Sequence, residues 1–101
     1  MAYGLFSRLT AQSGKRDDLA GYLLRAAELL APDPDCLHYL VATSAGSDVV
    51  CVYETWTDQR AHDASLERDD IRQLVQAATP SIAGPPEQTR LTVLGGKGVS
   101  A

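Results

Sequence analysis

The sequence predicts an α+β fold of the ferredoxin-like kind, with the order β-α-β-β-α-β and an antiparallel sheet. Three observations lead to this prediction. A segment with helical periodicity follows the first strand-like segment, a hairpin pattern comes next, and a second helical region precedes a last strand-like segment. The length of 101 residues suits one domain. We assign it to residues 1–96 and expect residues 97–101 to form a flexible tail.

The first part of the chain predicts a strand and then a helix. Residues 3–12 alternate in polarity, which favours a strand. From 15 to 31, apolar residues recur at helical spacing and form one face. Asp17 and Asp18 lie in the first turn, where the helix dipole favours acidic side chains, and the "PDPD" segment at 32–35 ends the helix.

Two further strands at 36–44 and 48–56 flank an "AGS" turn and predict a hairpin. Its geometry bears on Cys36 and Cys51. They would lie about five residues apart along the pair, roughly 16 Å at the usual rise per residue. A disulfide requires Cα atoms within about 7 Å. We therefore expect two free thiols in a reducing compartment.

The remainder of the chain predicts helical segments and a last strand. Asp58 can cap a helix through "QRAHDASLER", and Asp69 or Asp70 can cap a second helical stretch. Prolines between 80 and 86 end that stretch, and residues 88–95 form the last strand.

The third strand is apolar on both of its faces, which predicts self-association. Alternate residues fall into two sets: Val50, Val52 and Trp56 on one face, and Val49, Cys51 and Tyr53 on the other. The helices can cover only one face of the sheet. We expect the other face to meet the same face of a second copy, giving a homodimer through the sheet face.

Composition and charge exclude several classes of partner. The net charge is −4 and the pI is about 4.9, which argues against nucleic acid and against an anionic membrane surface. The longest apolar stretch is interrupted by Arg25 and Glu28, and no signal peptide is recognisable, so we expect a cytoplasmic protein. The chain contains no GxGxxG, P-loop, HExxH or CxxC motif, so nothing supports a bound nucleotide or zinc.

Five short segments, spread from Tyr3 to about Leu94, suggest a family. They are "RLT" at 8–10, "GKRDDL" at 14–19, "DPDCLHY" at 33–39, "YETW" at 53–56 and "DQRAHDASLERDDIRQL" at 58–74. In this order and spacing the sequence resembles the antibiotic-biosynthesis monooxygenase family, whose members are dimeric α+β barrels.

The resemblance implies a cofactor-independent monooxygenase. Its phenolic or hydroquinone-type aromatic substrate would give electrons directly to dioxygen, the co-substrate, inside an apolar cavity between sheet and helices. No metal or bound cofactor is implied. The alternative is a non-catalytic small-ligand-binding protein, or a purely structural dimer, of the same fold.

The sequence departs from the family pattern on the helix after Trp56. Many members carry a histidine nine residues beyond the tryptophan, where this chain has Ser65, and another five residues later, where it has Asp70. The haem-degrading branch uses a first-strand asparagine at the position of Ser7. A serine hydroxyl is neither a neutral-pH base nor an obvious axial ligand of haem iron. The resemblance therefore favours the quinol-type reaction over haem degradation.

Two residues are candidates for catalysis. Trp56 could line the cavity and orient a flat substrate, or it could be a core anchor whose N–H is satisfied by the backbone. His62 could be the base, tuned by burial or by a nearby carboxylate such as Asp63, or it could be a half-exposed helix residue.

Four residues are candidates for substrate binding. Ser65 could bond a ligand hydroxyl, or it could bond back to the carbonyl of Ala61 in the preceding turn. Ser7 offers a second hydroxyl, and Tyr22 is the best placed of the tyrosines. Glu54 shares the face of Trp56 and could be a cavity carboxylate.

Glu54 needs a partner if it is buried, because an unpaired buried carboxylate is costly. Arg8 and Arg90 are the basic candidates across the sheet. His38 could also face Glu54, but only if the hairpin loop has three residues, because a loop of two or four sends His38 to the opposite face.

Overall fold

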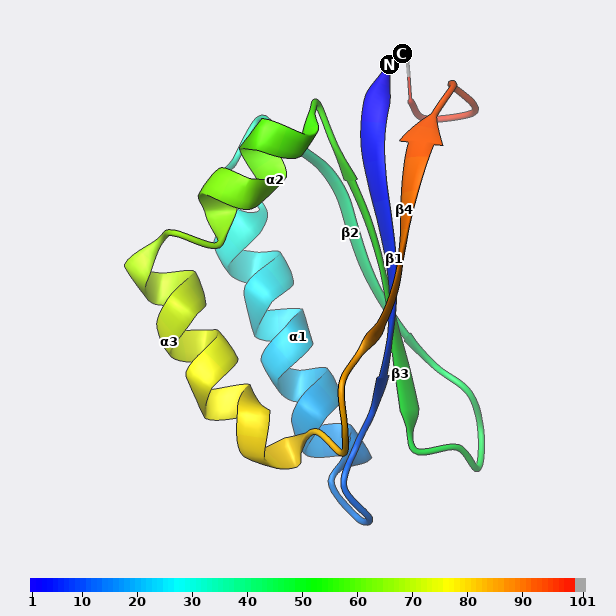
Figure 1. Ribbon diagram of the computed structural model, residues 1–101, viewed down its shortest axis with the longest axis vertical. Helices are drawn as coiled ribbons and strands as arrows, with labels where there is room; N and C mark the ends of the chain where they lie inside the picture. Colours follow the sequence, from blue (N-terminus) through cyan, green and yellow to red (C-terminus); the bar gives the residue numbers. More distant parts are fainter. Residues whose placement is uncertain (100–101) are drawn as a thin grey trace.

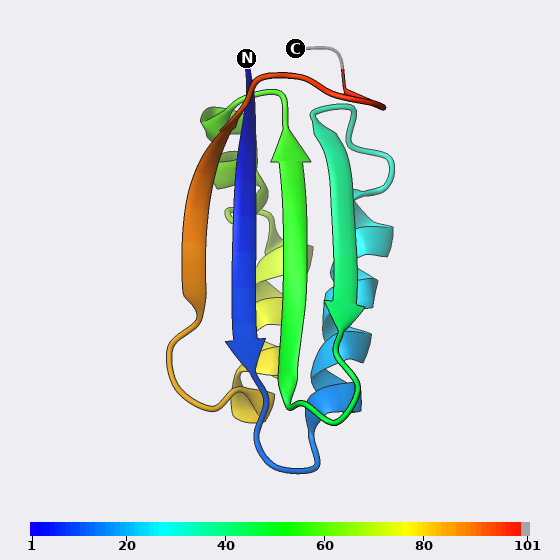
Figure 2. The ribbon, with the colours of Figure 1, turned by 90° about the vertical axis from the view of Figure 1, so that its right-hand side faces the viewer.

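The computed structural model describes residues 1–99 and confirms the ferredoxin-like prediction. Its elements are β1 (Ala2–Thr10), α1 (Arg16–Leu30), β2 (Cys36–Thr43), β3 (Val49–Trp56), α2 (Gln59–Ser65), α3 (Asp69–Ala78), a 3₁₀ turn η1 (Thr79–Ser81) and β4 (Glu87–Val93). The four antiparallel strands are arranged in the order β2-β3-β1-β4, as Figure 2 shows.

The molecule has two layers. All three helices cover one face of the sheet, and the chain leaves most of the other face, here called the outer face, open (Figures 1 and 2). The helix layer lies over β1, β2 and β3, and the edge strand β4 stands apart from α3 (Figure 1). Within residues 1–99, no helix has the length and apolar character needed to cross a membrane.

Two apolar clusters join the helices to the sheet. One cluster surrounds Leu19, the most deeply buried residue of α1, and includes Val50 and Val52 of β3. The other joins Leu30, Trp56 and Ile71. The predicted helical face of α1 is therefore the face that the sheet buries.

The segment after β3 begins as predicted and then differs. Asp58 is the N-cap of α2, and its Oδ1 accepts a hydrogen bond from the Ala61 N–H at 2.8 Å. The prediction that Asp69 or Asp70 caps the next helix is wrong, because Arg68 occupies the N-cap position of α3. The Arg68 guanidinium instead bonds Asp70 at 2.7 Å and the carbonyl of Leu29 at 3.3 Å, which ties this turn to the end of α1.

The hairpin register settles which way β2 presents its side chains. Tyr39 pairs with Glu54, and a bulge at residue 37 precedes His38, which pairs with Thr55. Side chains alternate along a strand, so Tyr39 faces the helices and His38 lies on the outer face. The same register sets Cys51 opposite Ala42, well along the hairpin from Cys36, and both thiols are free.

The outer face carries exposed apolar side chains from all four strands. They are Phe6, Leu40, Tyr53 and Leu91. The chain after β4 crosses one end of this face, and Gly96 and Val99 form a short bridge there (Figure 2). Of the predicted tail, residues 100–101 lie outside the described residues.

Candidate active site

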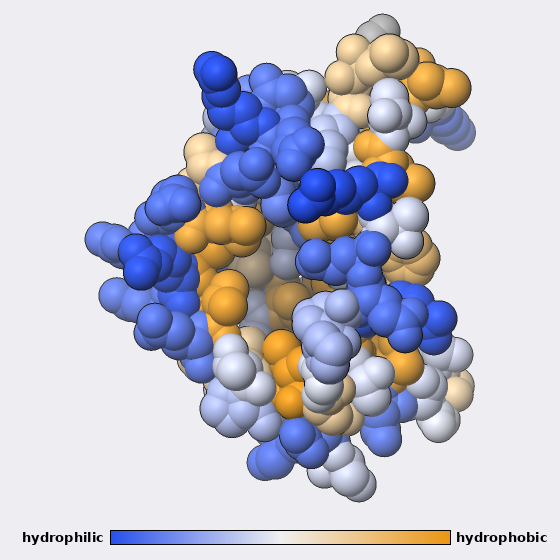
Figure 3. All heavy atoms as spheres, in the orientation of Figure 1, coloured by the Kyte–Doolittle hydropathy of each residue, from blue (hydrophilic) through white to orange (hydrophobic). Residues whose placement is uncertain are grey.

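A cavity of about 290 Å³ lies between the sheet and the helices. Figure 3 shows it as a hollow between α3 and β4, with apolar side chains around its opening. The apolar part of its wall includes Leu5, Leu23, Ala26, Leu30, Ile71 and Leu74. The cavity exists because the helices pack mainly against β2 and β3, and the edge strand β4 stands apart from α3 (Figure 1).

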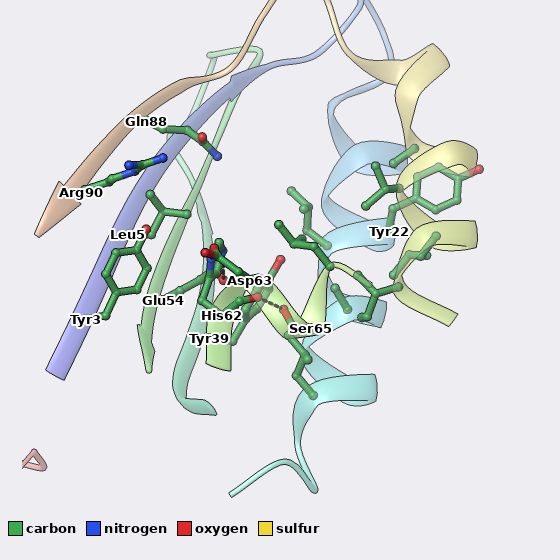
Figure 4. A pocket seen from close by; sticks show the side chains of 18 residues that line it. Tyr3, Leu5, Tyr22, Tyr39, Glu54, His62, Asp63, Ser65, Gln88 and Arg90 are labelled. Carbon is green, nitrogen blue, oxygen red and sulfur yellow. Dashed lines mark hydrogen bonds and ion pairs between the residues drawn. The ribbon is translucent and has the colours of Figure 1, made fainter. Parts of the chain in front are cut away.

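The polar groups of the cavity fall into two sets (Figure 4). Glu54, His62 and Asp63 lie together at one end, and Glu54 and His62 are 9% and 8% exposed. Gln88 and Arg90 project from β4, where both are exposed. The cavity thus has a buried acidic end and a solvent-exposed rim that carries a cation.

Glu54 is held by the tryptophan two residues along the same strand. The Trp56 indole N–H donates a hydrogen bond to Glu54 Oε1 at 3.1 Å. Because side chains alternate along a strand, residues 54 and 56 share the helix-facing side of β3. Glu54 is therefore paired as expected, but its partner is neither of the arginines considered above.

His62 stands between two carboxylates. Its Nδ1 lies 3.0 Å from Asp63 Oδ1, and its Nε2 lies 3.8 Å from Glu54 Oε1. The rings of Tyr3 and Trp56 pack against it, with centroid separations of 5.4 Å and 5.8 Å. A carboxylate beside Nδ1 favours the tautomer with its proton on Nδ1. Nε2 is then the basic atom, and it faces Glu54.

Burial shifts two acidic groups at this end of the cavity. Burial raises the pKa of Glu54, although the Trp56 hydrogen bond and His62 oppose that shift. Burial also raises the pKa of Tyr39, and the neighbouring Glu54 adds to the effect. Tyr39 is therefore a neutral hydroxyl group at ordinary pH, able to donate a hydrogen bond.

Trp56 and Ser7 are buried but do not line the cavity. Trp56 is 0% exposed and belongs to the core cluster with Leu30 and Ile71, so its role at the site is to hold Glu54. Ser7 accepts a hydrogen bond from the Gln88 side-chain amide at 3.3 Å. These positions correspond to the core-anchor alternative for Trp56 and to a supporting position for Ser7.

Ser65 and Tyr22 both lie in the cavity wall. The Ser65 hydroxyl donates to the carbonyl of His62 at 2.6 Å, so its proton is used inside α2. This is the back-bonding alternative, with the carbonyl one residue later than Ala61. The Tyr22 hydroxyl points away from Glu54 and His62 in Figure 4, so its ring contributes mainly apolar wall.

Sequence reasoning missed Tyr39 and gave Arg90 only as a partner of Glu54. Tyr39 faces the cavity because of the hairpin register, which the sequence left open. Arg90 reaches the rim because it pairs with Leu5 on the helix-facing side of the sheet, whereas Arg8 is exposed on the outer face. A correct hairpin register would have identified Tyr39.

The arrangement can transfer protons. A basic imidazole nitrogen, a carboxyl with a raised pKa and a neutral phenol meet at the end of an apolar chamber, which suits general acid–base chemistry on a bound hydroxyl group. Within residues 1–99, no group of three or more His, Cys, Asp or Glu residues is placed to hold a metal ion.

Comparison with known proteins agrees with this fold. Two solved structures are from a candidate antibiotic biosynthesis monooxygenase of Chloroflexus aurantiacus and from a mutant form of SnoaB, a cofactor-independent oxygenase of Streptomyces nogalater. The Chloroflexus protein is 30% identical in sequence to this chain, and its structure superposes with a TM-score of 0.87. The match covers 99% of this chain and 100% of the Chloroflexus chain. SnoaB is 16% identical, covers 95% and 96%, and has a TM-score of 0.79, so its likeness concerns the fold.

A search of curated proteins gives no match. The family model described as antibiotic biosynthesis monooxygenase matches residues 3–77, about three quarters of the sequence. This range includes every residue that lines the cavity except Ala78, Gln88 and Arg90. The chain belongs to the antibiotic biosynthesis monooxygenase family.

Proposed function

We propose that this protein is a cofactor-independent monooxygenase acting on a phenolic or hydroquinone-type aromatic substrate in the cavity between sheet and helices. Family membership and the fold shared with SnoaB support the proposal. The observation that carries it is the buried pair of Glu54 and His62, with the exposed Asp63 beside His62, in a largely apolar chamber.

The base in this proposal is His62. A substrate hydroxyl placed beside His62 and Glu54 gives its proton to Nε2, because the Asp63 carboxylate holds the other proton on Nδ1. The imidazolium that forms lies near the Glu54 carboxyl, which can share the added charge. Tyr39 supplies a neutral O–H donor for the phenolate oxygen.

The phenolate then supplies every electron that the oxygenation requires. It passes one electron to dioxygen, and the two resulting radicals combine to form a carbon–oxygen bond. The peroxide takes back the proton held by His62. The same ring carbon then loses its hydrogen as a proton to Nε2 while the O–O bond breaks, and a carbonyl forms at that carbon. The departing hydroxide takes this proton and leaves as water. One oxygen atom enters the product and the other leaves as water, so a CH₂ or its enol form becomes a C=O group.

The proposal includes a homodimer through the outer face. Phe6, Leu40, Tyr53 and Leu91 expose apolar surface from all four strands on this side. If the outer face of a second protomer packed against this face, the exposed apolar surface would be removed from water. No residue of the cavity would be displaced, because the cavity lies on the helix side of the sheet.

Oxygen uptake with a panel of hydroquinones and naphthols tests the reaction. We expect turnover by wild type and a rate roughly 10²–10⁴ lower for His62→Ala, the range typical of a lost general base. His38→Ala is the matched control, because His38 lies on the outer face and should keep the wild-type rate. Equal rates for wild type and His62→Ala would remove the proposed role of His62.

A non-catalytic ligand-binding protein is the second candidate. One observation favours it. The family resemblance leads one to expect a histidine at position 65, but this chain has Ser65, whose hydroxyl donates its hydrogen bond to the carbonyl of His62. In that case aromatic ligands would bind and quench or shift Trp56 fluorescence through the Glu54 network, but oxygen uptake would stay at the protein-free rate.

A further inference from the structure

The rim of the cavity carries a cation that forms no ion pair with any side chain among residues 1–99. Arg90 lines the cavity, and within residues 1–99 it takes part in none of the ion pairs between basic and acidic side chains. The acid on its own strand, Glu87, pairs in register with Arg8, and by alternation both lie on the outer face.

The sheet register explains why Arg90 and Glu54 do not meet. Leu5 of β1 pairs with Glu54 on one side and with Arg90 on the other. Their Cα atoms are thus two strand spacings apart, roughly 10 Å, with the Leu5 side chain between them. Glu54 is turned to Trp56 and His62 instead. The cation and the acids therefore lie apart in one chamber, with Leu5 between them, as Figure 4 shows.

We infer that Arg90, with Gln88 beside it, forms a carboxylate subsite, and that the substrates are phenolic acids. This deepens the oxygenase proposal and rests on it for the orientation of the phenol. The reacting hydroxyl lies beside His62 and Glu54, and the carboxylate lies at the rim on β4. The planar guanidinium fork matches a carboxylate with two parallel hydrogen bonds.

Gln88 is suited to assist Arg90. It lies two residues before Arg90 on the same side of β4, and one amide N–H is held by the Ser7 hydroxyl at 3.3 Å. The bond to buried Ser7 fixes the amide plane and leaves its second N–H available to an anion.

The charge distribution also determines the direction in which the ligand binds. The chain has a net charge of −4, and the far end of the cavity holds Glu54 and Asp63. A carboxylate placed at that end would meet like charge, whereas at the rim it meets the guanidinium. The rim is open to solvent, so the charge remains partly hydrated when it binds.

Anaerobic binding of two matched naphthols tests the subsite separately from the chemistry. One probe is a hydroxynaphthoate with its hydroxyl and carboxylate at opposite ends of the fused rings, and the other is its neutral carboxamide. We expect calorimetry at low salt to give wild type a roughly five- to tenfold preference for the carboxylate, as expected for one exposed charge-assisted contact. The preference should shrink as salt is added.

Variants assign the preference to Arg90. Arg90→Gln should bind both probes equally, Arg90→Lys should keep part of the preference, and Arg8→Gln, on the outer face, should keep all of it. All of these residues are exposed, so melting temperatures should confirm intact folds. Equal binding of the probes by wild type, no binding of either, or a preference that survives in Arg90→Gln would overturn the subsite.

The outcomes for the two proposals are distinguishable because this assay needs no turnover. A carboxylate preference without oxygen uptake would keep the subsite and remove the oxygenase. Oxygen uptake with hydroquinones but equal binding of the two naphthols would keep the oxygenase and remove the subsite.

Discussion

The hydrogen bond from Trp56 to Glu54 predicts a measurable coupling between a core residue and a cavity carboxyl. In Trp56→Phe the buried carboxyl of Glu54 loses its only protein donor at hydrogen-bond distance within the described chain, apart from the more distant His62. Losing a hydrogen bond to a charged group costs about 1.5–3 kcal/mol. The smaller ring in a fully buried site adds roughly 1–2 kcal/mol.

The expected sum is about 2.5–5 kcal/mol, a large part of the roughly 5–15 kcal/mol that a domain of this size has available. In a Glu54→Leu background no carboxyl remains to be satisfied and the buried indole N–H has lost its acceptor, so the same Trp56→Phe change should cost the ring term or less. Urea unfolding of the four proteins gives the coupling free energy directly. We expect about 1.5–3 kcal/mol, and a value below roughly 0.5 kcal/mol would refute the hydrogen-bond assignment.

Three further predictions concern pH, backbone entropy and assembly. Burial raises the pKa of Glu54, so the folded protein keeps this proton to a higher pH than the unfolded chain does. The folded protein therefore loses stability as the pH rises from the ordinary carboxyl range through the raised pKa. The stability of Glu54→Gln relative to wild type should therefore increase over that window in urea unfolding, and a constant difference would contradict the raised pKa. Gly21→Ala in α1 should stabilise the folded protein by roughly 0.5–1 kcal/mol, because nothing lies within 4 Å of the added Cβ. Gly4→Ala should destabilise the folded protein, because its Cβ would lie 3.0 Å from Val93 Cγ2. Equal melting temperatures for the two variants would contradict this. In analytical ultracentrifugation wild type should sediment as the proposed dimer, and Tyr53→Asp on the outer face should sediment as a monomer. The same sedimentation coefficient for both proteins would contradict the proposed dimer.

Local rules explain which parts of the fold were predictable. Asp58 precedes α2 and caps it, because a short acidic side chain before a helix has one good local partner, the N–H three residues on. Asp69 and Asp70 offered the same pattern, but Arg68 binds both Asp70 and the Leu29 carbonyl. That contact joins residues far apart in the sequence, so no local rule could anticipate the shift of the cap to Arg68.

The site was harder to predict than the fold because it depends on strand register. The sequence placed Glu54 and Trp56 on one side of β3 from alternation alone, and the hydrogen bond between them follows from that shared side. Whether His38 or Tyr39 joins them depends on one residue in the hairpin loop, because the register runs unbroken from the loop to His38. Side chains alternate between the two faces of a sheet, so an error of one residue in the predicted register moves every side chain of the strand to the opposite face.

Glu54 is the residue at which stability and the proposed chemistry conflict. Its burial opposes ionisation, and the Trp56 N–H and His62 offset only part of that cost. A leucine would remove the buried carboxyl but leave the Trp56 N–H without its acceptor, so Glu54→Leu gains stability only if losing the buried charge outweighs the cost of that unpaired N–H. Keeping a carboxyl there is consistent with a residue retained for its proton rather than for packing. If Glu54→Leu gains stability and loses oxygen uptake together, the two effects come from the same buried group.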